Sequence, residues 1–311
     1  MSSLSLTDKN LYLSTTKDGY AALKALLEEN KPIDIILTLP SEDSVGVSDF
    51  QDFGVLAAEF KKPIIYINSI KSLQQQFIEE RPNLLIVNGW SQLIPEQMIN
   101  SCKVGCIGTH PALLPKNRGR APVAWHFINE EEYGGVTLFY LDKGCDSGPI
   151  IDQEKFEIKE DDNASTYYEM ITKIGAQLLL RHIDVLTTKK IEAKVQDESK
   201  ATYLLKRRPK DSILDFSLAG KNIVNQVRAV TDIYPLANFE YSGNTYFVKK
   251  ALLLKDAPTY SGSNGQIAKV NDDNIWVLTP DSVICLSDIF DSNNLQVNVK
   301  KVFKEGWVLN E

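Results

Sequence analysis

The chain has 311 residues, of which 43% are hydrophobic and 24% charged, and its formal net charge is −7. This composition is typical of a soluble globular protein, and the length allows two domains that each bury a core. The longest apolar runs are far too short to cross a bilayer and the first residues show no signal-peptide pattern, so we expect a cytoplasmic protein without membrane contact. Four cysteines favour buried thiols over a disulfide framework or a metal site.

The charge is distributed unevenly along the chain. Residues 1–200 carry 21 basic and 29 acidic side chains, whereas residues 201–311 carry 13 and 12. Neither part has the positive excess of a protein that binds a phosphate backbone, which argues against a nucleic-acid partner. The basic segment 206–210 could form a local patch, although a solvated linker is the simpler interpretation.

Strand-like and helix-like segments alternate through the first part of the chain, which predicts βαβ units and a parallel sheet with helices on both faces. A single glycine follows the first strand, so the dinucleotide-binding fingerprint is absent and an oxidoreductase built on it is excluded. We expect strands at 10–14, 33–39, 64–67, 84–87, 105–108 and 135–141, and helices at 19–29, 49–60, 73–80, 95–100 and 164–186.

The second part of the chain reads differently. Residues 187–210 are polar and indicate a linker, and a helix is expected at 218–230. Short alternating strands separated by turns then predict a small barrel. These strands are expected at 245–254, 266–270, 275–278, 283–286 and 295–299. The sequence therefore predicts an α/β domain over residues 1–200 and a smaller β-rich domain over residues 201–311.

Two polar residues follow strands of the predicted sheet. His110 comes directly after the strand at 105–108, and Asp146 lies in a Gly-Cys-Asp-Ser-Gly turn after the strand at 135–141. Active sites of such sheets lie beyond the carboxyl ends of the strands. An imidazole and a carboxylate there can remove a proton from an amine beside a polarised carbonyl. With only three histidines in the chain, few residues compete for the role of base.

The segment around His110 continues as Pro111-Ala112-Leu113-Leu114-Pro115. Together with the downstream Asp146, it resembles the Asn-x-His-Pro-x-Leu-Leu-Pro motif of the N10-formyltetrahydrofolate-dependent formyltransferases. That family includes methionyl-tRNA formyltransferase, glycinamide ribonucleotide formyltransferase and sugar-nucleotide N-formyltransferases, such as those acting on UDP-4-amino-4-deoxy-L-arabinose. The resemblance implies a Rossmann-like catalytic domain, an OB-like barrel, a folate formyl donor and no metal.

One position departs from the family motif. Gly108 stands where the family has an asparagine that donates a hydrogen bond to the formyl oxygen. Losing such a donor commonly costs about 100-fold in rate. Because glycine leaves space, we expect an ordered water or protonated His110 to replace the donor. The hydroxyl of Thr109 has a secondary role in this interpretation, because neighbouring strand residues point to opposite faces.

The resemblance also assigns the binding residues. Main-chain atoms of the segment after the strand at 84–87 would hold the pterin ring, and the loop that contains Asp146 would close over it. These donor-binding residues are Trp90, Ser91, Gln92, Leu93, Ile94, Leu141, Asp142, Gly144 and Asp146. Basic residues at the mouth of an acidic domain suit a diphosphate, which favours Lys116, Asn117 and Arg118 as acceptor-binding residues.

These observations predict an N-formyltransferase that acts on the amine of a nucleotide-linked amino sugar, with N10-formyltetrahydrofolate as formyl donor. His110 is the expected base or acid, and Asp146 the residue that orients it. One alternative is methionyl-tRNA formylation. Another is a binding module for folate or sugar nucleotides in which Gly108 has impaired catalysis. Expected partners are the small-molecule acceptor and a second copy of the chain in a homodimer, without nucleic acid.

Overall fold

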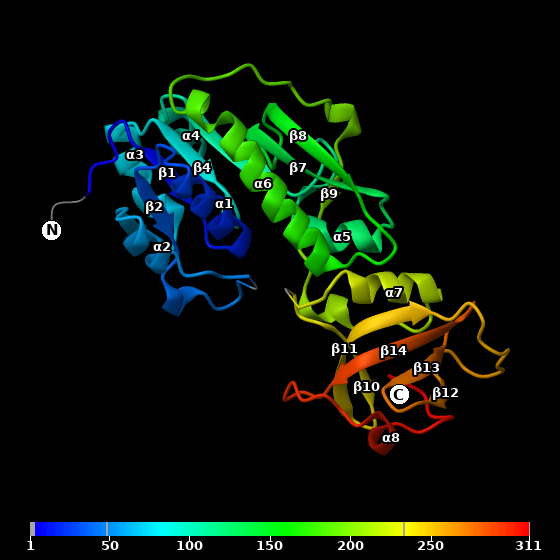
Figure 1. Ribbon diagram of the computed structural model, residues 1–311. Helices are drawn as coiled ribbons and strands as arrows, with labels where there is room; N and C mark the ends of the chain where they lie inside the picture. The colour runs from blue at the N-terminus through cyan, green and yellow to red at the C-terminus, as the bar shows by residue number, and fades with distance from the viewer. Residues whose placement is uncertain (1–3, 48, 233, 311) are drawn as a thin grey trace. The chain divides into compact units, whose positions relative to one another are not determined.

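A computed structural model describes residues 4–47, 49–232 and 234–310 (Figure 1). The chain divides into two compact units. Unit 1 comprises Met1–Pro122, Tyr133–Ile158 and Tyr167–Leu205, and unit 2 comprises Val123–Glu132, Lys159–Thr166 and Lys206–Glu311. The sequence predicts one boundary after residue 200. In the structure the chain passes from unit 1 to unit 2 for the last time after Leu205. Two short segments from the first 200 residues, 123–132 and 159–166, also belong to unit 2.

A seven-stranded sheet forms the centre of unit 1, in the order β3-β2-β1-β4-β5-β7-β8. Its first five strands pair in parallel, whereas β7 pairs antiparallel with both β5 and β8. The short loop between β7 and β8 can only join antiparallel neighbours, because parallel strands need a longer crossover. The strands are β1 Asn10–Leu13, β2 Ile35–Thr38, β3 Ile64–Tyr66, β4 Leu84–Val87, β5 Gly105–His110, β7 Tyr133–Tyr140 and β8 Ile150–Glu157.

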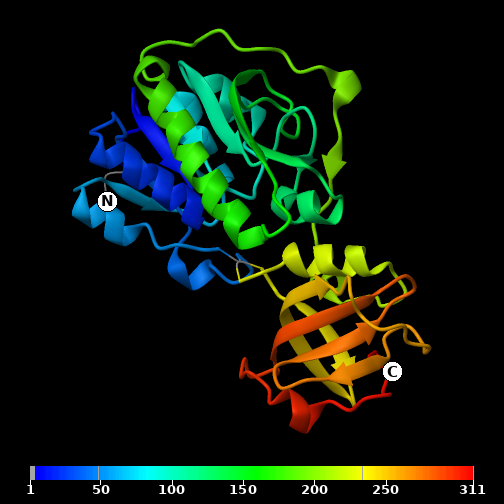
Figure 2. The ribbon, with the colours of Figure 1, turned by 45° about the vertical axis from the view of Figure 1, so that its right-hand side comes forward.

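Helices cover both faces of this sheet, as the alternating pattern predicts. On one face, Phe77 of α3 and Met98 of α4 join the buried strand residues. On the other face α1 and α6 lie side by side (Figures 1 and 2), and the Tyr12 hydroxyl of β1 donates to the Gly19 carbonyl of α1. The helices are α1 Lys17–Glu28, α2 Gly54–Glu59, α3 Gln74–Glu80, α4 Glu96–Ser101 and α6 Ala164–Leu186. Within the described residues, no helix combines the length and apolar character needed to span a membrane.

The helix expected at 49–60 begins only at Gly54. Residues 49–51 instead hydrogen-bond to the loop after β1, because the Lys17 amide donates to the Asp49 carbonyl and the Gln51 amide to the Thr15 carbonyl. Main-chain groups that are committed to a neighbouring loop cannot form the first helical turn. The loop between β2 and α2 is therefore fastened to the carboxyl edge of the sheet.

Unit 2 is built on a five-stranded antiparallel sheet in the order β10-β11-β14-β13-β12. The strands are β10 Ala237–Tyr241, β11 Asn244–Leu253, β12 Ile267–Val270, β13 Asn274–Leu278 and β14 Val283–Phe290. The C-terminal residues link its edges, because the Ile267 amide donates to the Trp307 carbonyl and the Asn310 amide to the Glu240 carbonyl. The predicted α/β domain followed by a β domain is thus confirmed.

Among the described residues, three α-helices lie in unit 2, apart from the first residue of α5: α5 Pro122–Ile128, α7 Gly220–Arg228 and α8 Val299–Val302. The strand expected at 295–299 is wrong. Only Gln296 forms a bridge there, with Phe290, and the side chain of Asn298 accepts from the Lys301 amide. That hydrogen bond caps the N-terminus of α8. The chain therefore begins a helix where the apolar alternation predicts a strand.

Candidate active site

His110 is the last residue of β5 and is 6% exposed. Its Nε2 lies 2.7 Å from the carbonyl oxygen of Asn117. Because a carbonyl only accepts hydrogen bonds, Nε2 must carry the hydrogen in this contact. In the neutral ring Nδ1 is then unprotonated, with its lone pair available as a base.

Asp146 faces that nitrogen. Its Oδ2 lies 3.6 Å from His110 Nδ1 and accepts a hydrogen bond of 2.8 Å from the Gly119 amide. Asp146 has a φ of 51°, a left-handed conformation that is uncommon for residues with a side chain and that aspartate adopts more readily than most. Its turn is closed by Asp142, whose Oδ1 accepts from the Gly144 amide and the Ser147 hydroxyl.

In this arrangement His110 can accept and release one proton. Nδ1 can take a proton from an amine, and the carboxylate of Asp146 then stabilises the resulting imidazolium by charge. The bond from Nε2 to Asn117 holds the ring in the orientation that this exchange requires. The structure therefore brings together the two residues that the sequence singles out as a catalytic pair.

The space beside Gly108 is narrower than the sequence suggests. A Cβ at this position would lie 3.0 Å from Leu141 Cδ2 and 3.3 Å from the Val87 carbonyl oxygen. The expectation of open room for a water or part of the acceptor therefore needs correction, because the Leu141 side chain lies over the glycine. Position 108 itself offers no side-chain donor, as expected.

Thr109 lies on the other side of β5. It lines a cavity with room for about one water, together with Asp18, Asn88 and residues of α6. Gly108 and His110 are its neighbours along the strand, and neighbouring strand residues point to opposite faces. The Thr109 hydroxyl is therefore not placed beside the catalytic pair.

Three of the residues expected to hold the folate belong to one apolar cluster. Trp90 and Leu141 pack against the buried core that includes Ile94. The Trp90 Nε1 is buried and has no hydrogen-bond partner among the residues that the structure describes. Trp90 and Leu141 thus pack in the core of unit 1, and the pterin-binding role expected of them stays a prediction.

Other residues expected to bind the donor form hydrogen bonds within the protein or are exposed. The Gln92 side chain accepts from the Ile70 amide and donates to the Asn68 carbonyl, so it anchors a neighbouring loop. Leu93 is 71% exposed. The carbonyl of Ser91 accepts from Arg120 at 3.4 Å. These contacts leave main-chain atoms of the segment, rather than the Gln92 amide, for ligand recognition.

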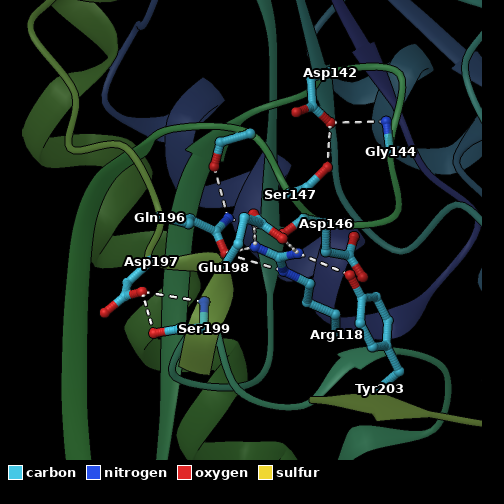
Figure 3. Close-up of polar contacts among 11 residues, drawn as sticks. Arg118, Asp142, Gly144, Asp146, Ser147, Gln196, Asp197, Glu198, Ser199 and Tyr203 are labelled. Atoms are coloured by element: carbon cyan, nitrogen blue, oxygen red, sulfur yellow. Dashed lines mark hydrogen bonds and ion pairs between the residues drawn. The ribbon is translucent and has the colours of Figure 1, made fainter. Parts of the chain in front are cut away.

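Arg118 is not available to bind a phosphate. It is fully buried in β6 (Arg118–Gly119), and its guanidinium bonds to Gln196, Glu198 and Tyr203 (Figure 3). The acceptor-binding role predicted for it is therefore corrected. Within the basic segment 116–120, Arg120 is the exposed arginine, and Lys116 is exposed as well. The sequence alone contains no signal for this difference, because the partners of Arg118 lie about 80 residues downstream.

Family models and relatives of known function match this chain along most of its length. A family model described as formyl transferase matches residues 10–183, and one described as formyl transferase, C-terminal domain, matches residues 206–305. Methionyl-tRNA formyltransferase from Syntrophus aciditrophicus is 26% identical over 293 residues, covering 93% of each chain. The same enzyme from Desulforamulus reducens is 31% identical over 224 residues, covering 71% of each chain.

A solved N-formyltransferase from Helicobacter canadensis, in complex with folinic acid and dTDP-3-aminofucose, has the same fold. Its TM-score is 0.67 at 17% identity, over 90% of this chain and 98% of its own. The family expected from the motif around His110 is thus confirmed by models that together span most of the chain. This chain belongs to the formyl transferase family and is a folate-dependent formyltransferase.

Proposed function

We propose that this formyltransferase transfers the formyl group of N10-formyltetrahydrofolate to the primary amine of a nucleotide-linked amino sugar. The folate supplies the formyl carbon. His110 takes a proton from the attacking amine at Nδ1, and Asp146 stabilises the charged ring. A new C–N bond forms, the bond from the formyl carbon to N10 breaks, and the proton is returned to N10 as it leaves.

The residues that hold the donor in this proposal are Trp90, Leu141 and the main chain of 90–94. The developing oxyanion needs a donor in place of the family asparagine. Since Leu141 covers Gly108 and Thr109 faces the α6 side, protonated His110 or a water beside it remains for this role.

The charge at the carboxyl edge of the sheet is the observation that carries the choice of acceptor. The loop 39–53, between β2 and α2, holds Glu42, Asp43, Asp49 and Asp52 and neither lysine nor arginine. Acidic side chains at the edge that holds the catalytic pair repel a long phosphate backbone. The exposed cations beside the pair, Lys116 and Arg120, are sufficient for one diphosphate.

Methionyl-tRNA formylation is the second candidate, and the sequence relatives favour it. Relatives of that name match up to 95% of this chain. The exposed Lys206 and Arg208 of the basic segment could bind phosphates of a tRNA. The two candidates differ in where cations are needed: on segment 116–120 for a nucleotide sugar, and also on segment 206–210 for a tRNA.

A formylation assay with a panel of acceptors separates them. The full chain and N10-formyltetrahydrofolate are incubated with amino sugars linked to UDP, dTDP, GDP or CMP, or with methionyl-tRNA, and the formylated acceptor is detected by mass. A thermal-shift screen with the same nucleotides identifies the base, because a ligand of the native state raises the melting temperature. We expect one nucleotide sugar to react, and efficient, steeply salt-dependent formylation of methionyl-tRNA would contradict the proposal.

Two arginine variants test where the acceptor binds. Arg120→Ala should raise the KM for the acceptor by about tenfold or more, because a charge-assisted contact to phosphate is lost, and should change the KM for the folate less. Arg208→Ala is the matched control and should leave both KM values unchanged. If instead Arg208→Ala weakens the acceptor and Arg120→Ala does not, the tRNA candidate is favoured.

A further inference from the structure

We propose that a clamp formed by Arg118, Gln196, Glu198 and Tyr203 positions the catalytic pair. Its members lie in β6 and in the segment 196–204, which follows α6 and contains β9 (Tyr203–Leu204). None of the four touches the reacting atoms in this inference, so they are positioning residues. The inference rests on the catalytic roles proposed above for His110 and Asp146.

Arg118 is the centre of the clamp, and every one of its five guanidinium N–H groups is used. Nε and Nη2 donate to Gln196 Oε1 at 3.1 and 2.8 Å. Nη1 and Nη2 donate to the two carboxylate oxygens of Glu198 at 2.9 and 2.7 Å, and Nη1 also donates to the Tyr203 hydroxyl at 3.0 Å. A buried arginine with this set of acceptors has a structural task, because no donor is left for a ligand.

Gln196 connects Arg118 to the turn that contains Asp146. Its amide nitrogen donates to the carbonyls of Asp146 at 2.8 Å and Gly148 at 2.7 Å, while its oxygen accepts the two bonds from Arg118 (Figure 3). The side chain is 6% exposed, so water cannot easily replace these bonds. Gln196 therefore joins the arginine to the main chain of a residue that sits at a φ of 51°.

The same segment holds the other half of the pair. β6 and β9 pair in parallel, and the Thr202 hydroxyl accepts a hydrogen bond of 2.8 Å from the Asn117 amide. Asn117 in turn binds His110 through its carbonyl. Both catalytic side chains thus bond to main-chain atoms of 117–119, and that short stretch is held by residues 202–204.

Gly119 shows how closely the two strands must approach. Its φ is 106°, and a Cβ at this position would lie 2.5 Å from the Leu204 carbonyl oxygen. Only glycine fits both conditions. The Gly119 amide is the donor to Asp146 Oδ2, so the pairing of β6 with β9 sets the position of the carboxylate as well.

The test uses Gln196→Glu in the full chain. A glutamate keeps an acceptor for Arg118 but replaces the NH2 group by one carboxylate oxygen, which faces the Asp146 and Gly148 carbonyls without a hydrogen to donate. Gln226→Glu is the matched control, because the Gln226 amide also donates to two main-chain carbonyls, those of Asp211 and Ile213, within unit 2. The measurements are kcat, the KM for folate and acceptor, the affinity for 5-formyltetrahydrofolate and the melting temperature.

A readout that needs no acceptor accompanies the kinetics. The chain has three histidines, so the ring resonances of His110 can be assigned by NMR with His110→Ala. Gln196→Glu should shift these resonances, because Asp146 moves relative to the ring, and Gln226→Glu should not. A merely structural glutamine elsewhere would leave them in place.

We expect Gln196→Glu to lower kcat by about 10- to 100-fold, as misplacement of a catalytic group does, while both KM values and the folate affinity change by about twofold at most. Unchanged kcat and unchanged His110 resonances would overturn the clamp, as would a fall in kcat that Gln226→Glu reproduces. If Gln196→Glu does not fold, Tyr203→Phe, which removes one acceptor from Arg118, must show a smaller fall in kcat of the same kind or the inference fails.

Different experimental results would refute the clamp and the proposed catalytic pair. Near-normal turnover in His110→Ala would remove the pair itself, whatever Gln196 does. Turnover that is lost in His110→Ala but normal in Gln196→Glu would leave the pair intact and remove only the clamp.

Discussion

At the scale of single residues, Arg118 and Arg120 show how different two arginines of one short segment can be. Arg118 is fully buried, whereas Arg120 is exposed with one nitrogen on the Ser91 carbonyl. Their spacing alone suggests two equivalent cations at the mouth of the site. Burial separates them, because a guanidinium whose five N–H groups all bond to protein has no donor left for a phosphate.

The first residue-level prediction concerns the pair. His110→Ala or Asp146→Ala should each lower turnover by about 100-fold or more, because each removes part of one proton-transfer unit. The double variant should be little worse than either single one, since residues that act as a unit are not additive. Steady-state kinetics with saturating folate measures this, and additive losses would show two independent roles.

A second prediction concerns Gly108→Asn. The new Cβ lies 3.0 Å from Leu141 Cδ2, so Leu141 must move and the variant should lose about 1–3 kcal/mol of stability by overpacking. Leu141→Ala in the same chain should recover part of that loss. Denaturant unfolding of the single and double variants measures the coupling. Equal stability of Gly108→Asn and the unchanged chain would show that the space is open after all.

At the scale of elements, the loop 39–53 is tied down by a polar cluster. The Tyr168 hydroxyl of α6 lies 3.0 Å from Asp18 Oδ1 and also bonds to Asp49 Oδ2. A phenol has one hydrogen and cannot donate to two carboxylates in full. Burial raises the pKa of Asp49, the bond from Tyr168 lowers it, and the nearby charge of Asp18 raises it, for a net rise.

The pH dependence follows from the sign of this shift. A carboxyl with a raised pKa in the folded state stabilises the fold below its unfolded pKa, and this contribution is lost as the pH rises through the folded pKa. Asp49→Asn is neutral throughout. Its melting temperature relative to the unchanged chain should therefore increase between about pH 4 and neutral pH.

Asp256→Asn, at an exposed position, is the control for this series. Its melting temperature relative to the unchanged chain should show no comparable trend. A difference for Asp49→Asn that stays constant across the pH range would mean that Asp49 does not hold its proton more tightly in the folded state.

At the scale of the whole molecule, the two units are not consecutive in sequence. Within unit 2, Arg228 of α7 donates to the carbonyls of Asp162 and Lys159, and Lys221 pairs with Glu130. Segments of the first part of the chain thus complete the unit formed mainly by the second part. A boundary drawn after residue 200 also cuts β9 away from β6.

This last point gives a prediction for fragments. A fragment of residues 1–205 keeps Tyr203 and the pairing of β9 with β6, whereas a fragment of residues 1–200 loses them. We expect the longer fragment to melt at a higher temperature and to bind 5-formyltetrahydrofolate more tightly, because Gly119 and Asp146 stay in place. Identical melting and affinity would show that β9 is dispensable for the site.

The parts of the fold that the sequence predicts best are those with strong periodicity. The expected bounds of the strand at 84–87 and the helix at 164–186 agree with β4 and α6. Failures occur where main-chain bonds to distant residues override the local pattern. Residues 49–53 lose their helical turns to the loop after β1, and residues 295–299 yield to a cap on α8. The strands β6, β8, β9 and β10 carry too weak a pattern to be predicted.

The sequence by itself determines the family and the alternating α/β order, and it predicts His110 and Asp146 as the catalytic pair, because hydrophobic periodicity and a local motif are properties of neighbouring residues. Only the tertiary structure decides which arginine is buried, that Leu141 covers Gly108, and that Gln196 holds the turn of Asp146. These contacts join residues 33 to 85 positions apart, and their formation depends on how the sheet brings the segments together. Spacing along the chain contains no record of such contacts, since burial and hydrogen bonding are satisfied in space.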